Sequence, residues 1–177
     1  IGFAIVFLPY LRIGGMQLFQ TESSDASEKV MPRTGDIAAS LFKVYCGLTA
    51  LCALTYYFLG MSGFDAINHA LTTLPTGGYS THDASFGYFQ SPALQYAATF
   101  FMLLGGLPFV LYIKLIFQGR FAFFNDDQFK TILAMLLAFI IVLSSWLWWQ
   151  SDYSLSQSVQ YVAFNVVSVI TTTGYAT

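Results

Sequence analysis

The chain has 177 residues, of which 56% are hydrophobic and only 9% are charged, against about 25% charged residues in an ordinary soluble protein. Mean hydropathy is +0.62, so the apolar surface exceeds what a globule of this size can bury, which excludes a soluble fold. The net charge of −2 and the absence of a basic run exclude nucleic-acid binding, and the apolar composition excludes intrinsic disorder.

Three apolar segments are predicted to cross a membrane: residues 37–61, 93–117 and 131–149. As helices they would be about 37, 37 and 28 Å long, enough for a hydrocarbon core of about 30 Å. Lys43 and Lys114 lie near the ends of the first two segments, from where a long side chain reaches the headgroups. Residues 1–16 are interpreted as the end of a preceding transmembrane helix.

The basic residues fall in two groups: Arg12, Lys29, Arg33 and Lys43, then Lys114, Arg120 and Lys130. The connections 62–92 and 150–157 contain no Lys or Arg. The positive-inside rule therefore places residues 17–36 and 118–130 in the cytoplasm and the two uncharged connections outside, apart from segments that re-enter. Trp146, Trp148 and Trp149 are expected to anchor the third span at the outer interface.

Two shorter segments are predicted to be helices that enter the membrane from outside without crossing it. Residues 64–74 have Ser62 or Asp65 as a start signal and Pro75 as a stop, and at about 16 Å they reach half the bilayer. Residues 154–170 form a second helix-compatible stretch that is too polar at its beginning to span. The two segments occupy equivalent places after the first and third spans.

Each short segment leads into a related loop. Residues 76–81 read Thr-Gly-Gly-Tyr-Ser-Thr and residues 172–177 read Thr-Thr-Gly-Tyr-Ala-Thr. At an offset of 96 residues, four positions agree: Thr76/Thr172, Gly78/Gly174, Tyr79/Tyr175 and Thr81/Thr177. The repeat predicts an all-α membrane protein made of modules, with a cytoplasmic loop at 17–36, a complete module at 37–120, and at 121–177 a cytoplasmic loop followed by the front of the next module.

Irregular backbone at membrane depth is unfavourable unless it is buried in protein or lines a watery cavity, because each unsatisfied carbonyl costs several kcal/mol in lipid. Carbonyl oxygens can replace the hydration shell of a cation, and glycine permits the dihedral angles that aim them. The C-terminal dipole end of each short helix favours a cation at the same place. The predicted ligands are the backbone carbonyls of Thr76, Gly77, Gly78, Thr172, Thr173 and Gly174, in loops completed by Tyr79 and Tyr175. The alternative for a single loop is a simple turn after a helix.

Other candidate residues have weaker signals. Asp83 and Asp152, with Asp65, lie on the predicted outer side and either raise the local cation concentration at a vestibule or serve as capping and surface residues. His69 and His82 are interpreted as packing residues. The segment of Gly105, Gly106 and Pro108 interrupts the second span and predicts a helix kink or, as the alternative, a gating hinge.

At these residues the chain resembles the Trk/Ktr/HKT superfamily of potassium transporters, and most closely its bacterial TrkH branch. The resemblance covers nearly the whole sequence and is carried by residues 13–19 (IGGMQLF), 21–24 (TESS), 31–33 (MPR), 74–81 (LPTGGYST) and 170–177 (ITTTGYAT). It implies four linked repeats of helix, pore helix, filter loop and helix around one potassium-channel-like pore, incomplete in this chain. Gly78 and Gly174 then take the places of filter glycines in the second and third repeats.

The resemblance implies potassium uptake across the bacterial inner membrane, with K⁺ as the transported ion, no bound cofactor and no enzymatic activity. It also implies a homodimer in the lipid bilayer and a cytosolic nucleotide-binding regulatory subunit. A sodium-permeable or cation-coupled member of the family is the first alternative. A membrane scaffold or intramembrane enzyme is the second, although residues 93–117 and 131–149 contain no Asp, Glu or His for such chemistry.

Overall fold

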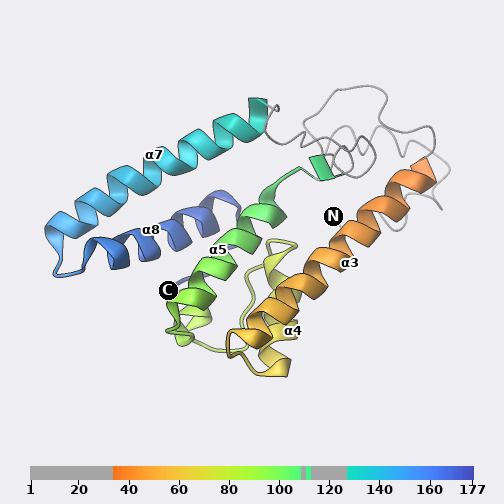
Figure 1. Cartoon of the computed structure of the whole chain (residues 1–177), viewed down its shortest axis with the longest axis horizontal. Helices are drawn as coiled ribbons and strands as arrows, with labels where there is room; N and C mark the ends of the chain where they lie inside the picture. The colour runs from red at the N-terminus through yellow and green to blue at the C-terminus, as the bar shows by residue number, and fades with distance from the viewer. Residues whose placement is uncertain (1–33, 109–110, 113–126) are drawn as a thin grey trace. The chain divides into compact units, whose positions relative to one another are not determined.

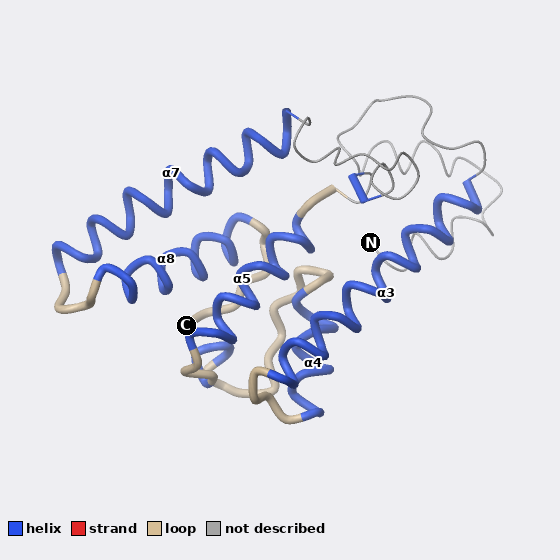
Figure 2. Tube along the Cα trace, in the orientation of Figure 1, coloured by secondary structure: helices blue, strands red, loops and turns tan. Residues whose placement is uncertain are grey.

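The computed structural model describes residues 34–108, 111–112 and 127–177, and in these residues it is helical without a strand (Figure 2). The chain divides into two compact units. The first holds residues 34–48, 107–108 and 111–112 of the described chain, and the second holds residues 49–106 and 127–177. Both predicted loops, with the helices that lead into them, belong to the second unit.

Among the described residues, two helices are long and apolar enough to cross a membrane. Helix α3 covers Thr34–Phe58 and α7 covers Asp127–Gln150, with apolar stretches at Ser40–Phe58 and Lys130–Gln150. Large apolar side chains on both helices are exposed, among them Phe58 at 81% and Trp149 at 90%. Such faces suit contact with lipid, where no water has to be ordered around them.

The short helices begin at well-formed caps. Helix α4 covers Gly63–Thr73, and the Ser62 hydroxyl at its N-cap accepts a hydrogen bond from the Asp65 backbone N–H at 3.1 Å. Helix α8 covers Leu155–Ile170, and at its start Ser154 and Gln157 form a capping box. Each box or cap satisfies backbone donors that a helix end leaves unpaired.

The helix expected over 93–117 is interrupted at the segment that the sequence marked as a break. Helix α5 covers Pro92–Gly106, Leu107 and Pro108 are not helical, and Leu111 and Tyr112 are helical again. Proline has no N–H to donate and disfavours helical geometry in the residue before it, which ends the helix at this point. The remainder of the predicted span, at 109–110 and 113–117, lies outside the described residues. A further short element that the sequence did not indicate, the 3₁₀ helix η1, covers Ser85–Tyr88.

Within the second unit α8 packs against both α7 and α5, and α4 packs against α5 (Figure 1). The ring of Phe86, fully buried in η1, lies at the centre of an aromatic cluster. Its ring centroid is 5.2 Å from those of Phe164 on α8 and Tyr175 in the second loop, and 5.9 Å from that of Tyr56 on α3. This cluster joins the element that follows the first loop to the second loop.

Candidate ion-coordinating site

The two loops have positive φ at the same two positions. Thr76 and Gly78 in the first loop have φ of 55° and 64°, and Thr172 and Gly174 in the second have φ of 60° and 83°. Left-handed geometry costs about 1–2 kcal/mol in a residue with a Cβ, so two threonines in this region mark a backbone that its surroundings hold in place. The sequence repeat at 96 residues is therefore also a repeat of dihedral angles.

The hydrogen bonds that close each loop recur as well. The Gly78 N–H donates to the Thr72 carbonyl and the Gly174 N–H donates to the Ser168 carbonyl, both at 3.2 Å. Each bond folds the loop back onto the last turn of its own helix.

The six carbonyls predicted as ligands accept no hydrogen bond from any described residue; they belong to Thr76, Gly77, Gly78, Thr172, Thr173 and Gly174. The next carbonyl along each loop is engaged instead. The Tyr79 oxygen accepts from Thr72 Oγ1 at 2.8 Å, and the Tyr175 oxygen accepts from Ser168 Oγ at 2.7 Å. Each loop thus offers three consecutive carbonyls whose acceptor capacity is available to a cation.

The structure brings the two loops together at Gly78. A Cβ built on this glycine would clash with the carbonyl oxygen of Thr173, whereas one on Gly174 would meet no atom within 4 Å. Thr173 is buried, and its hydroxyl lies 2.9 Å from the hydroxyl of Thr171. Glycine at position 78 is therefore required both by its positive φ and by the close approach of the second loop.

Both short helices end at these loops, with Leu74 and Thr171 as their C-caps. The Gly105–Gly106 pair at the end of α5 lies against both ends. A Cβ on Gly105 would come within 2.5 Å of the Leu74 carbonyl oxygen, and one on Gly106 within 2.7 Å of the Thr171 methyl carbon. Absence of side chains here lets α5 approach the C-termini of both helices, whose negative dipole ends favour a cation. A hinge at Gly105, Gly106 and Pro108 stays a prediction.

The acidic residues predicted to lie on the outer side are divided between structural and exposed positions. Asp65 accepts hydrogen bonds from Thr81 Oγ1 at 2.6 Å and Ser62 Oγ at 2.7 Å, and these bonds lower the pKa of the Asp65 carboxyl. Asp83 and Asp152 are exposed, and their vestibule role stays a prediction.

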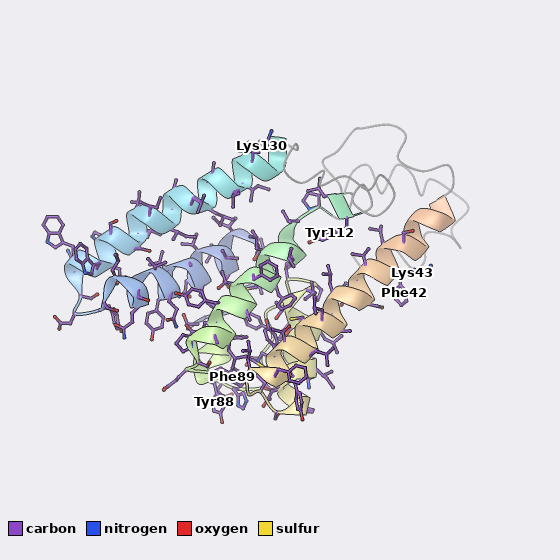
Figure 3. All side chains as sticks on the ribbon, in the orientation of Figure 1. Phe42, Lys43, Tyr88, Phe89, Tyr112 and Lys130 are labelled. Atoms are coloured by element: carbon purple, nitrogen blue, oxygen red, sulfur yellow. The ribbon has the colours of Figure 1, made fainter. Side chains whose placement is uncertain are left out.

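The two histidines lie beside the first loop. His69 is fully buried, with Nδ1 2.8 Å from the Asp65 carbonyl oxygen and Nε2 3.0 Å from Ser80 Oγ. The His82 ring stacks on Tyr88 at 3.7 Å and lies 5.4 Å from the ring of Phe89, and its Nε2 is 3.4 Å from Asp65 Oδ1. Tyr88 and Phe89 are labelled in Figure 3. Both rings pack against neighbours, as the sequence analysis expected.

Sequence reasoning missed the support that η1 gives to the second loop. The Gly87 N–H donates to the Ala176 carbonyl at 2.9 Å, and the Ala176 N–H donates to Ser85 Oγ at 3.3 Å. These contacts join residues about 90 positions apart, and no local pattern in the segment Ser85–Tyr88 signals them. The only available signal was the aromatic–glycine sequence of this segment, which is also common in ordinary loops.

Known proteins are similar to this chain in sequence and in fold. A family model described as TrkH, cation transport protein, matches residues 1–177. The chain is 51% identical over 173 residues to the Trk system potassium uptake protein TrkI of Halomonas elongata, covering 97% of this chain and 35% of that protein. It is 36% identical over 179 residues to the Trk system potassium uptake protein TrkH of Escherichia coli, covering 98% and 37%.

A solved structure agrees with these matches. The crystal structure of the potassium transporter TrkH from Vibrio parahaemolyticus superposes with a TM-score of 0.79 and 30% sequence identity. The match covers 99% of this chain and 35% of the other. The chain thus spans little more than a third of the length of the relatives it matches.

Proposed function

Because the chain belongs to the TrkH family of cation transport proteins, we propose that it forms part of a potassium uptake pore in the bacterial inner membrane. The observation that carries the proposal is the pair of loops with matching left-handed backbones and three unengaged carbonyls each. The potassium uptake named for its relatives gives these carbonyls a ligand of suitable charge and size.

In the proposed mechanism K⁺ loses part of its hydration water and is coordinated by carbonyls of the two loops. The carbonyl dipoles substitute for water, and the C-terminal ends of α4 and α8 add a favourable field at the same place. Transport makes and breaks no covalent bond, so the pore needs no catalytic residue. Transport is driven by the electrochemical gradient of the ion.

The arrangement around this site follows the repeat. In this proposal, residues 37–120 correspond to a complete unit of helix, pore helix, filter loop and helix, and residues 121–177 correspond to a loop and the front of the next unit. A homodimer and a cytosolic nucleotide-binding regulatory subunit complete the proposal. The polar segment at 17–36, the proposed contact for that subunit, lies outside the described residues.

The test is ion flux into liposomes that contain a full-length Trk protein carrying this sequence at its corresponding position. Rb⁺ or K⁺ uptake is compared with Na⁺ uptake for the wild type, Gly78→Ser and Gly174→Ser at equal reconstitution. We expect a K⁺-selective wild type and a reduced preference in both variants. A wild type that moves no alkali cation, or variants with unchanged preference, would overturn the filter assignment, and equal Na⁺ and K⁺ uptake would favour a sodium-permeable protein.

A further inference from the structure

A hydroxyl side chain stands at the same place in the last turn of each short helix. Thr72 on α4 and Ser168 on α8 are related by the 96-residue offset, and each precedes its filter glycine by six positions. Thr72 Oγ1 donates to the Tyr79 carbonyl at 2.8 Å, and Ser168 Oγ donates to the Tyr175 carbonyl at 2.7 Å. The same bond is therefore built twice from two different residue types.

These bonds are more than ordinary capping of the helix. Thr72 Oγ1 also lies near the carbonyls of Asn68 and His69 on its own helix, but at 3.2 Å to each. Of these three carbonyls, that of Tyr79 in the loop is the nearest. Ser168 is fully buried, so the carbonyl of Tyr175 would have no water to replace a lost hydroxyl.

The phenol of Tyr175 connects the two loops. Its ring is 3% exposed, and its hydroxyl lies 2.6 Å from Thr72 Oγ1. The Tyr175 hydroxyl also lies 3.2 Å from the His69 carbonyl and 3.5 Å from the Tyr79 carbonyl, and either hydroxyl of the Thr72–Tyr175 pair can be the donor. Hydrogen-bond contacts thus connect Tyr175 in the second loop with Thr72 and the Tyr79 carbonyl in the first.

We propose that Thr72, Ser168 and Tyr175 are positioning residues that hold the two tyrosine carbonyls away from the ion, so that each coordinating set ends at its filter glycine. The proposal rests on the proposed function of the loops as an ion filter. A carbonyl oxygen has two lone pairs, and one that accepts a short hydrogen bond from the scaffold is held in that direction, which places it poorly for replacing a water of hydration. The hydroxyls therefore determine how many carbonyls each loop offers to the ion. Tyr175 makes the position of the Tyr79 carbonyl in the first loop depend on the second loop.

The test uses a full-length Trk protein carrying this sequence, reconstituted in liposomes, with K⁺ and Na⁺ uptake measured in parallel. Thr72→Val and Ser168→Ala remove the hydroxyls with little change of shape, and Tyr175→Phe removes only the phenolic oxygen. Each is expected to lower the K⁺/Na⁺ uptake ratio about tenfold, the effect of one hydrogen bond of about 1.4 kcal/mol. The conservative variants Thr72→Ser and Ser168→Thr are expected to keep the wild-type ratio.

Matched controls remove the same groups elsewhere. Thr55→Val deletes a hydroxyl that donates to the Leu51 carbonyl at 2.8 Å on α3, and Tyr57→Phe alters an exposed phenol on the same helix. Neither should change the ratio. If Thr72→Val does not reach the membrane, Tyr175→Phe, which keeps the packed ring, decides the result.

The outcomes separate this inference from the proposed function. A selective wild type with an unchanged ratio in Tyr175→Phe and Ser168→Ala overturns the positioning role and leaves the filter in place. The same holds if Thr72→Ser and Ser168→Thr fail as badly as the deletions, because shape would then matter rather than the hydroxyl. A wild type that transports neither ion overturns both.

Discussion

The two loops share a backbone but differ in what surrounds their tyrosines. Tyr79 in the first loop is 78% exposed, whereas Tyr175 in the second is 3% exposed and rests on the end of α4. The dihedral angles and closing bonds of each loop come from its own helix, so they appear in both copies. The tyrosine environment comes from the neighbouring module, and among the described residues only the second loop has such a neighbour. Local geometry is therefore intrinsic to the repeat, while support of the tyrosine is shared between repeats.

The loops also differ in how their last threonines are held. Thr81 donates to the carboxylate of Asp65 at 2.6 Å, whereas Thr177 accepts from the amide of Asn165 at 2.9 Å. A charged acceptor gives a stronger bond than a neutral one, but its strength depends on pH. The first loop is accordingly the copy whose stability should respond to acid.

The largest expected effect comes from the aromatic support of the second loop. Phe86→Ala should lower the free energy of unfolding by about 3–5 kcal/mol, because a fully buried ring next to Tyr175 is removed. Thermal denaturation of the purified protein in detergent measures this, with Phe58→Ala at an 81% exposed position as the control. A drop of equal size in both variants would show that η1 does not hold the second loop.

Alanine substitutions at Gly78 and Gly174 should reduce transport to different degrees. Gly78→Ala combines a positive φ with a clash against the Thr173 carbonyl, while Gly174→Ala meets only the conformational cost of about 1–2 kcal/mol. We expect Rb⁺ uptake to fall further in Gly78→Ala than in Gly174→Ala, by about tenfold or more. Equal losses would mean that the close approach at Gly78 does not distinguish the copies.

A similar steric argument applies to the end of α5. Gly105→Ala would place a methyl group against the Leu74 carbonyl and should cost about 1–3 kcal/mol of stability. Gly47→Ala, at a helical glycine with nothing within 4 Å of the new methyl group, should be neutral or slightly stabilising. Melting temperatures of both variants measure the difference. Identical shifts would argue against close packing of α5 on the end of α4.

The smallest expected effect is the acid response of the first loop. The pKa of Asp65 is lowered by its bonds from Thr81 and then Ser62, so its contribution is complete above the unfolded value of about 3.9 and is lost as the pH falls through the lower folded value. Asp65→Asn should therefore be less stable than wild type near pH 6, with a difference that shrinks below about pH 4.

The matched variant for this measurement is Asn165→Ala, which removes the neutral bond to Thr177 in the second loop. Its stability deficit should not depend on pH between 3 and about 6, because no carboxylate is lost. A deficit with the same pH dependence in both variants would contradict the assignment of acid sensitivity to Asp65.

Much of the fold followed from the sequence, for physical reasons that can be named. Long apolar runs predicted α3 and α7, and Ser62, Pro75 and Ser154 marked the ends of the short helices closely, because caps and proline act locally. The break in the expected span at 93–117 was also marked in the sequence, because Pro108 has no N–H to donate and α5 ends two residues before it, at Gly106.

The candidate site could be predicted from the sequence only in part. The 96-residue repeat indicated which residues form matching loops, since glycine and threonine recur at the positions with positive φ. Contacts between modules were not predictable. The bond of Tyr175 to Thr72 joins residues 103 positions apart, and it depends on tertiary packing that leaves no local pattern.

The central claim is that the carbonyls of the two loops coordinate one line of ions. The most direct measurement is a structure of a full-length Trk protein carrying this sequence, determined in Tl⁺ or Rb⁺ with anomalous scattering to locate the ion. The account predicts density between the loops at the level of the carbonyls of residues 76–78 and 172–174, and none at the carbonyls of Tyr79 and Tyr175. Ions bound at the tyrosine carbonyls, or none between the loops at saturating salt, would contradict it.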